Sequence, residues 1–272
     1  MNHKQLMTFK ADWLRPAFVH FRLDAGTLQQ QVPFELDTFD GQAIVSLVAF
    51  TQSRLRPTVG GRLTELLSTP LATHEFLNLR TYVRHGNDRG IYFLAEWIPN
   101  RLAQLIGPAM YGLPYRLGRL SYDWNDASSE MTATVRARAG GVQFEGRWND
   151  AQPLDAAREG SIEHFLVERY SAFTTRGNTK MRFDVDHVPW PVAPMDVTIC
   201  DLSLAQSVLP RLRADDLIGA HRSPGVHDVL ISAPKTVGSR HPVGMRWGAI
   251  SNPFSPRVHA GWARKTPRGR GG

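Results

Sequence analysis

The sequence of 272 residues has only one cysteine, Cys200, so no disulfide bond can form within the chain. Its first residues lack the apolar core of a signal peptide, and both features are typical of a cytoplasmic protein. No apolar run approaches the roughly 20 residues that a membrane-spanning helix needs, so we expect no membrane segment. Cys200 lies in the apolar run 197–202 and is expected to be a small core residue.

Several motifs for catalysis and cofactor binding are also missing. The sequence contains no P-loop, no dinucleotide-binding glycine pattern, no Gly-x-Ser-x-Gly elbow, no His-Glu-x-x-His and no cysteine pair. Glu163 or His164 together with Glu168 has roughly the spacing of a metal-binding pair on one helix face, which is a weak signal by itself. We therefore expect no metal and no cofactor.

Acidic residues are scarce: 25 Asp and Glu face 32 Lys and Arg, which gives a formal net charge of +7. Residues 254–272 hold five of the basic residues and no acid, and their richness in Gly, Pro and Arg predicts a disordered tail. The remaining residues carry only +2 and are nearly neutral. We therefore predict a single domain over residues 1–253 with a basic tail, and nucleic acid is a disfavoured partner.

What the sequence does contain is a series of apolar segments rich in branched and aromatic residues and separated by turn formers. With few helical patterns among them, they predict a mainly β (α+β) domain, largely antiparallel, with accessory helices. Hairpins are expected at the turns 85–90 and 139–141, and residues 57–70, with a helical patch at 62–67, form either a lid or a connection. The expected helices cover 25–31, 100–111 and 161–170, and the expected strands cover 18–23, 42–54, 74–84, 91–98, 115–124, 131–138, 142–148, 180–187, 194–201 and 226–233.

A helix-to-strand corner is predicted at residues 106–118. Gly112 permits a left-handed turn, and Pro114 prevents the preceding helix from continuing. Such a corner can direct the next two side chains, Tyr115 and Arg116, toward one point, although the pattern alone favours a purely structural corner.

Four polar or ionisable side chains lie in the expected apolar strand 74–84: Glu75, Asn78, Arg80 and Tyr82. Burying such groups is costly unless they are paired, so this strand either lines a polar cavity or forms a wet sheet edge. Strand alternation places Asn78, Arg80 and Tyr82 on one face. Glu75 joins them only if a bulge intervenes, and otherwise it belongs to a different environment.

Residues 111–118, Tyr-Gly-Leu-Pro-Tyr-Arg-Leu-Gly, resemble the segment around the paired lysines of acetoacetate decarboxylases. In that family the first lysine forms a Schiff base, and the second cation lowers its pKa. Tyr115 and Arg116 stand at the two lysine positions, and arginine stays protonated. The resemblance therefore implies a site that does not use a Schiff base at these positions. Lys180 and Lys235 remain conceivable amines elsewhere.

A broader resemblance runs from about residue 13 to residue 234. Nine short segments in this range, taken in order, resemble the YqjF-like family, a bacterial group of unknown function in the acetoacetate decarboxylase-like superfamily. The resemblance implies a cone-like β barrel that encloses a small-molecule cavity. The matching segments are 13–16, 32–33, 40–41, 75–83, 90–93, 113–115, 165–170, 187–191 and 223–226.

The resemblance also implies site residues for a small anionic metabolite. Glu75 corresponds to a glutamate near the lysine of the decarboxylases, and Arg15 lies near the position of an arginine that holds their substrate carboxylate. Without the resemblance, Arg15, Arg80 and Arg116 are better explained as separate surface or ion-paired side chains. We predict Glu75 and Tyr115 as catalytic residues and Arg15, Asn78, Arg80, Tyr82 and Arg116 as substrate-binding residues.

Two main functions remain open at this point. The first is a lysine-independent enzyme that acts on a small carboxylate or carbonyl metabolite, and the second is a non-catalytic module that binds a small molecule. Nucleic-acid binding through the tail is a third and less favoured hypothesis. A carboxyl group with a raised pKa beside a tyrosine would favour catalysis, whereas an apolar pocket with a lone arginine would favour binding. The sequence specifies neither the substrate nor the oligomeric state.

Overall fold

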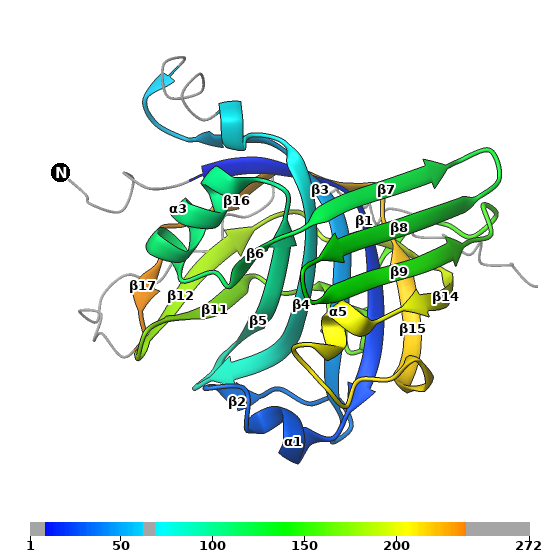
Figure 1. Ribbon diagram of the computed structural model, residues 1–272, viewed down its shortest axis with the longest axis horizontal. Coiled ribbons are helices and arrows are strands. Elements are labelled where there is room, and N and C mark those ends of the chain that lie inside the picture. The colour runs from blue at the N-terminus through cyan, green and yellow to red at the C-terminus, as the bar shows by residue number, and fades with distance from the viewer. Residues whose placement is uncertain (1–8, 62–68, 238–272) are drawn as a thin grey trace, which may run out of the picture. The chain divides into compact units, whose positions relative to one another are not determined.

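Thirteen strands form one large curled sheet in the computed structural model, which describes residues 9–61 and 69–237 (Figure 1). The described residues all belong to a unit of residues 1–239. The expected helical patch at 62–67, the domain boundary at 253 and the basic tail at 254–272 lie outside the described residues. In the part of the chain that the structure describes, no helix is long and apolar enough to cross a membrane.

The longest strands follow one another as antiparallel neighbours in the order β1 (Phe9–Leu23), β3 (Ala43–Pro57), β4 (His74–His85) and β5 (Asp88–Ile98). The sheet continues from β5 to a parallel neighbour and then through two further strands back to β1. The strand pairings thus start and end at β1, so each of these strands has one face that points toward the inside of the curled sheet. The strands that complete it are β11 (Ser171–Arg176), β12 (Thr179–Asp186) and β16 (Gly225–Ile231).

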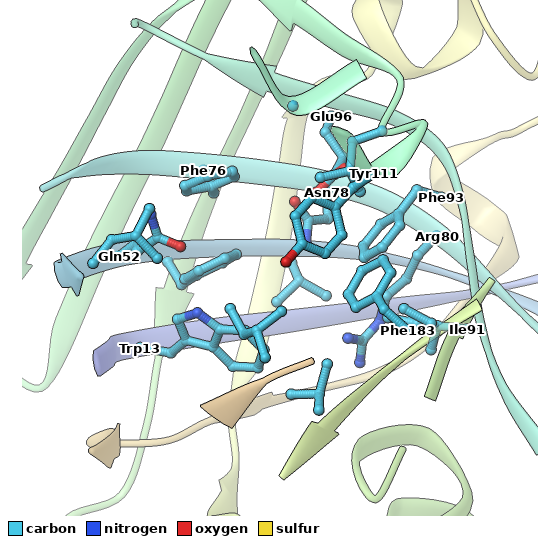
Figure 2. Close-up of a pocket in the computed structure, with 18 of the residues that line it drawn as sticks. Trp13, Gln52, Phe76, Asn78, Arg80, Ile91, Phe93, Glu96, Tyr111 and Phe183 are labelled. Carbon is cyan, nitrogen blue, oxygen red and sulfur yellow. The ribbon is translucent and has the colours of Figure 1, made fainter. Parts of the chain in front are cut away.

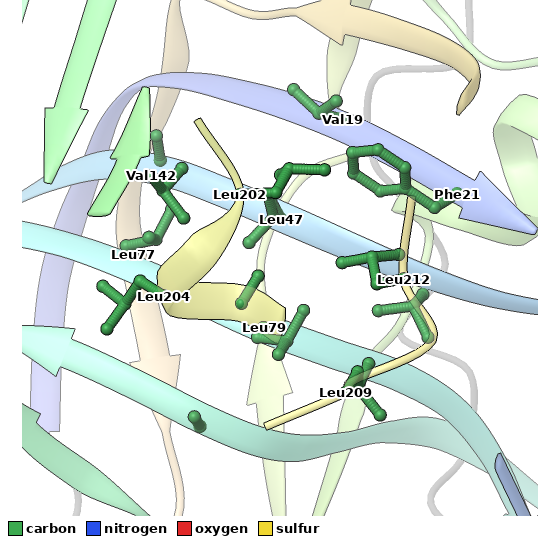
Figure 3. Close-up of a cluster of buried hydrophobic side chains, with 14 of the residues drawn as sticks. Val19, Phe21, Leu47, Leu77, Leu79, Val142, Leu202, Leu204, Leu209 and Leu212 are labelled. Atoms are coloured by element: carbon green, nitrogen blue, oxygen red, sulfur yellow. The ribbon is translucent and has the colours of Figure 1, made fainter. Parts of the chain in front are cut away.

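A second, four-stranded sheet packs with helices on the outer face of the large sheet (Figures 1 and 3). Val19, Leu47 and Leu79 of the large sheet lie in one buried cluster with Val142 of the second sheet and Leu204 of a short helix. This outer core supports the wall whose inner face carries the candidate site. The second sheet consists of β14 (Asp196–Asp201), β9 (Gly140–Arg147), β8 (Glu130–Ala137) and β7 (Arg119–Asn125).

Short elements complete the described fold. Asp24 caps the first helix by accepting a hydrogen bond from the Thr27 backbone N–H, and Asn100 caps α3 in the same way. The helices are α1 (Ala25–Gln29), α3 (Arg101–Tyr111), α4 (Ile162–Val167) and α5 (Ser203–Gln206), with 3₁₀ turns at Thr69–Leu71 and Ala214–Asp216. The remaining strands are β2 (Glu35–Leu36), β6 (Tyr115–Leu117), β10 (Asp155–Ala156), β13 (Pro191–Pro194), β15 (Leu217–Arg222) and β17 (Lys235–Thr236).

The mainly β fold and the two hairpins are confirmed, but several boundaries were wrong. The first strand begins at Phe9 rather than at residue 18, and the helix after Ser161 ends at Val167. The turn between β4 and β5 is only two residues long, because residues 85 and 88 pair directly. Cys200 is exposed, since alternation on β14 turns its neighbours at 197 and 199 toward the core instead.

The strand expected over residues 115–124 is two strands in different sheets. β6 pairs in parallel with β5, whereas β7 joins the second sheet. The chain divides at Gly118, whose N–H donates to the carbonyl of Ile98 at 3.0 Å. The helix-to-strand corner itself is confirmed, because Gly112 ends α3 in the left-handed conformation with φ of 69°.

Candidate functional site

A cavity of about 180 Å³ lies on the inner face of the large sheet (Figure 2). Its walls come from β1, β3, β4 and β5 and from α3, β6, β12 and the segment after α4. A cavity of about 150 Å³ is enough to hold a benzene molecule, so this one suits a small ligand. Phenylalanine and tryptophan side chains make up much of the lining, and polar groups interrupt them in a definite order.

The strand registers arrange the lining side chains in rows that cross neighbouring strands. Trp13, Gln52 and His74 are register partners on β1, β3 and β4, and they form the first row. Phe50 and Phe76 form the second row, with their rings stacked at 5.1 Å between centroids. Successive rows are two residues apart on each strand, or roughly 6.6 Å. One end of the cavity is therefore neutral and polar, and an aromatic layer follows it.

The next two rows carry the ionisable groups. Asn78 of β4 lies directly opposite Glu96 of β5, and Glu96 is in turn the register partner of Tyr115 on the parallel strand β6. Arg80 and Phe93 form the following row. Figure 2 shows Arg80 and Phe93 on the opposite side of the cavity from Trp13 and Gln52.

A β-bulge in β5 brings Glu96 to the inner face. The register of β4 with β5 shifts between Leu79 and Arg80, which leaves Leu94 as an extra residue without a partner on β4. Such a residue inverts the alternation of side chains along its strand. Phe93 before the bulge and Glu96 after it therefore both line the cavity, although they are three residues apart.

Glu96 is a buried carboxyl group, with only 3% of its surface exposed. Burial raises its pKa well above the ordinary value of 4.5, and the positive charge of Arg80 opposes this shift more weakly. Burial likewise raises the pKa of Tyr115, with further contributions from Glu96 and Tyr111. Both groups thus favour their protonated forms, which can donate hydrogen bonds into the cavity.

Arg80 is a buried guanidinium, 9% exposed, that has no ion-pair partner among residues 9–61 and 69–237. Its Nη2 donates to the carbonyl of Leu166 at 3.2 Å, and its Nε has no partner there. The neighbouring Arg169 is different, because its charge is balanced by Asp37 at 2.6 Å. The positive charge of Arg80 is therefore available to an anion in the cavity.

A chain of buried hydrogen bonds ends at the same carbonyl. The Tyr82 hydroxyl donates to the Leu166 carbonyl at 3.0 Å and lies 2.7 Å from the Ser46 hydroxyl. Ser46 is 2.8 Å from Nδ1 of His20, whose Nε2 is 3.1 Å from Nδ1 of His221. Because a carbonyl only accepts, the donors run in one direction, from His221 to His20, Ser46, Tyr82 and the carbonyl. These hydrogen bonds therefore help to orient the Leu166 carbonyl, which also accepts the hydrogen bond from Arg80.

Buried polar atoms without a hydrogen-bond partner among the described residues are concentrated in this cavity. Leaving such an atom unpaired costs about 1–3 kcal/mol, so proteins rarely accumulate them. Apart from Nε of Arg222, every such atom belongs to a residue that lines the cavity. They are Nε1 of Trp13, both ring nitrogens of His74, Oδ1 of Asn78, Nε of Arg80, Oε2 of Glu96, the hydroxyl of Tyr111 and Nη2 of Arg169.

Of the predicted site residues, Asn78, Arg80 and Tyr115 line this one cavity. Tyr82 lies on the same face of β4 and is fully buried, but it is not part of the cavity wall. Its contribution is indirect, through the hydrogen-bonded chain that ends at the Leu166 carbonyl.

Glu75 is not where the site hypothesis needs it. No bulge separates it from Asn78, so alternation places it on the outer face of β4. Burial raises the pKa of the half-buried Tyr122 of β7 well above its ordinary value, and the charge of Glu75 adds to this shift. Glu96 is the glutamate that occupies the cavity instead.

Of the three arginines predicted to bind the substrate, Arg15, Arg80 and Arg116, only Arg80 lines the cavity. Arg15 forms an ion pair with Asp126 at 2.7 Å. Arg116 follows Tyr115 on β6 and therefore points to the opposite face, where its guanidinium lies 5.7 Å from the centre of the Trp97 ring. Neither arginine lines the cavity wall.

The sequence reasoning missed Glu96, Trp13, Gln52, His74 and Tyr111. Glu96 offered a usable signal, since it is the only charged residue in the apolar segment 91–98. Of the described lining residues, none is a lysine or cysteine. Within residues 9–61 and 69–237, no group of three or more His, Cys, Asp or Glu side chains is arranged to hold a metal ion.

Sequence comparisons connect the chain to uncharacterised relatives. The model of DUF2071, described as an uncharacterized conserved protein, matches residues 10–227. The uncharacterized protein YqjF of Bacillus subtilis (strain 168) is 31% identical over 180 residues, which cover 65% of this chain and 72% of YqjF.

Solved structures with a similar fold are acetoacetate decarboxylase-like proteins. The acetoacetate decarboxylase of Legionella pneumophila has a TM-score of 0.60 at 12% identity, with 87% of this chain and 90% of that chain covered. The enduracididine biosynthesis enzyme MppR complexed with pyruvate has a TM-score of 0.60 at 11% identity, with 85% and 90% covered. Identities this low establish a shared fold alone.

Proposed function

Because the chain belongs to the DUF2071 family and has an acetoacetate decarboxylase-like fold, we propose that it is an enzyme that acts, without a lysine nucleophile, on a small monocarboxylate bearing a carbonyl group. The observation that carries the proposal is the uncompensated guanidinium of Arg80 in a buried cavity beside the Glu96 carboxyl group. In this proposal Arg80 binds the carboxylate of the substrate, and Glu96 is the acid.

Charge balance within the cavity supports a ligand with a single negative charge. Burial favours the neutral forms of Glu96 and of His74, whose pKa it lowers to about 4. Arg169 pairs with Asp37, which it shares with Arg89, and the Arg89 side chain is exposed so that water solvates its charge. Among the described residues of the cavity wall, Arg80 is then the only charged side chain without a counterion, and a ligand with one negative charge would neutralise it. A dianion would leave a second negative charge without a partner, which is costly in a buried site.

Glu96 and Tyr115 suit a substrate carbonyl. A carboxylic acid that stays protonated can donate a hydrogen bond to a carbonyl oxygen and pass its proton to that oxygen as negative charge develops there. Tyr115, the register partner of Glu96, would supply a second donor, and its raised pKa argues against a role as base. This arrangement polarises a carbonyl by hydrogen bonding alone.

The lining supports a mechanism without a Schiff base. The cavity wall contains no lysine among its described residues, and Lys235 is paired with Asp184 at 2.9 Å. Lys180 is exposed, and its Nζ lies 5.1 Å from the centre of the ring of Phe34, which belongs to the outer core. Arg116 carries a guanidinium and not an amine, and it faces away from the cavity.

The experiment that tests the proposal is proton exchange in heavy water. Wild-type protein is incubated with 2-oxo and 3-oxo monocarboxylates, and NMR follows deuterium uptake at the carbon next to the carbonyl. In the exchange step the Glu96 proton passes to the carbonyl oxygen while a water molecule takes the proton from the neighbouring carbon, and the reverse reaction in heavy water places deuterium on that carbon. We expect exchange above the uncatalysed rate with at least one ligand, and its loss in Glu96→Gln and Arg80→Met. Exchange that survives both substitutions would contradict the assignment of these roles.

A non-catalytic binding module is the second candidate, favoured by the aromatic residues that make up much of the wall. Carboxylates would then bind in an Arg80-dependent manner without any exchange or turnover. Isothermal titration calorimetry alongside the exchange experiment separates the two functions, because binding without exchange identifies the module.

A further inference from the structure

We propose that Trp13, Gln52 and His74 form a second subsite, which receives a neutral hydrogen-bonding group of the ligand at the end of the cavity away from Arg80. This inference deepens the proposed function and rests on it for one point only, the placement of the ligand carboxylate at Arg80. It predicts a bifunctional ligand: a monocarboxylate whose other end carries a hydroxyl, amide or carbonyl group.

The three side chains meet because of strand register. Gln52 of β3 is the register partner of Trp13 on one side and of His74 on the other. All three side chains line the cavity, and Gln52 and His74 are only 7% and 6% exposed. The row therefore belongs to the interior of the sheet and not to its surface.

Unpaired polar atoms in this row point to a ligand. Nε1 of Trp13 and both ring nitrogens of His74 are buried and have no partner among the described residues. The His74 ring is held in place by stacking on Phe76, with 4.7 Å between ring centroids. Together these atoms offer at least two donors and one acceptor, which a hydroxyl or amide can satisfy at once.

The subsite selects a neutral group because it contains no charge. Trp13 and Gln52 carry no charge. Burial lowers the pKa of His74 to about 4, so its ring is neutral as well. A second carboxylate would lack a cation here, and an ammonium group would lack an acid. Either charge would lose its hydration without compensation.

The aromatic row determines what joins the two ends of the ligand. Phe50 and Phe76 separate the row of His74 from that of Asn78 and Glu96, so a ligand that spans the rows passes over their stacked rings. Apolar methylene groups suit this stretch. A cavity of about 180 Å³ limits the ligand to a slender chain.

Matched ligand pairs test the subsite by calorimetry. Straight-chain acids from butanoate to dodecanoate are compared with their ω-hydroxy counterparts, for example hexanoate with 6-hydroxyhexanoate, because three row spacings of roughly 6.6 Å separate His74 from Arg80 along β4. Since one hydrogen bond changes binding by roughly threefold to tenfold, we expect the hydroxy acid of the best-fitting length to bind more tightly by about that factor. Adipate, with two carboxylates, should bind more weakly than hexanoate.

Substitutions then locate the effect. His74→Phe keeps the ring that stacks on Phe76 but removes both nitrogens, so the preference for the hydroxy acid should fall to about onefold while hexanoate binding is retained. Gln52→Leu is a second variant of similar size in case His74→Phe does not fold. His85→Phe, at the exposed end of the same strand, is the matched control and should keep the preference.

The neutral ligand 1-hexanol separates failure of this inference from failure of the proposed function. It carries no carboxylate, so its affinity should fall in His74→Phe and stay constant in Arg80→Met. Equal affinities of hexanol, or of the acid pair, for wild type and His74→Phe would overturn the subsite. Loss of carboxylate binding alone would count against the role of Arg80 and not against His74.

Discussion

Glu96 lies directly opposite Asn78 on the neighbouring strand, and Arg80 is the next inward-facing residue after Asn78. The carboxyl group, the amide and the guanidinium are therefore held by adjacent positions of a regular ladder rather than by flexible loops. Because this ladder is regular, single substitutions should change the chemistry of the cavity without moving its walls.

Glu96→Gln should stabilise the protein increasingly as the pH rises. The pKa of Glu96 in the folded protein lies above 4.5, so from about pH 4.5 upward the unfolded chain loses a proton that the folded protein keeps. Ionisation then favours the unfolded state, and wild-type stability falls by up to about 1.4 kcal/mol per pH unit relative to the variant. Urea unfolding between pH 4.5 and 8 measures this difference. Glu75→Gln, on the outer face, is the control, and parallel curves for wild type and Glu96→Gln would refute the prediction.

Arg80→Met should strongly weaken carboxylate binding while leaving the fold intact. A hydrogen bond to a charged group contributes about 1.5–3 kcal/mol, which corresponds to a loss of at least about tenfold in affinity. The free energy of unfolding should stay constant or rise, because the buried guanidinium has no ion-pair partner among the described residues. Arg116 lies five residues beyond α3 and outside the cavity, so the control variant Arg116→Met should bind hexanoate as tightly as the wild type does. Equal losses in the two variants would show that the effect is not specific to the cavity.

Tyr82→Phe should weaken carboxylate binding although Tyr82 does not line the cavity. The substitution removes the hydroxyl that joins Ser46 to the carbonyl of Leu166, which also accepts from Arg80. Tyr122→Phe is a matched control, because its hydroxyl also donates to a carbonyl, that of Phe76 at 2.7 Å, but lies outside this chain. Both variants should lose about 1–3 kcal/mol of stability, and only Tyr82→Phe should bind hexanoate less tightly. An unchanged affinity in Tyr82→Phe would mean that the chain is structural only.

No acetoacetate decarboxylation through a Schiff base is expected. Borohydride reduction in the presence of acetoacetate should leave the mass of the protein unchanged, since no lysine is found among the described cavity residues. Peptide mapping of any adduct would identify the amine responsible. An adduct at Lys180 or Lys235 would show that a lysine reaches the ligand by a route that the present arrangement does not provide.

Local sequence patterns predicted most of the long strands and the corner because these depend on neighbouring residues, but they did not predict β11 or β15. Gly112 and Pro114 determine the end of α3, and alternation correctly placed Asn78 and Arg80 together on the inner face of β4. The same alternation correctly separated Tyr115 from Arg116. These parts of the site follow from a period of two along a strand.

Pairing between distant strands was not predictable in the same way. The row of Trp13, Gln52 and His74 depends on the registers of three strands, and no single segment encodes it. Glu96 was missed because a bulge reverses its face, and a bulge is visible only when two strands are aligned. Glu75 was chosen for its position in a family motif, and its outward orientation shows that correspondence in sequence does not replace the geometry of the strand.

The bulge at Leu94 also bears on how chains of this kind can differ in length. Leu94 has no partner on β4, so a relative that lacks this one residue would close the gap into a regular ladder and keep both Phe93 and Glu96 facing inward. A deletion elsewhere in β5 has no such spare position and would turn part of the strand over. When relatives are aligned, a single-residue gap in this strand should therefore fall at Leu94. Gain or loss of a residue at this position changes the local curvature of β5 and keeps Glu96 facing the cavity.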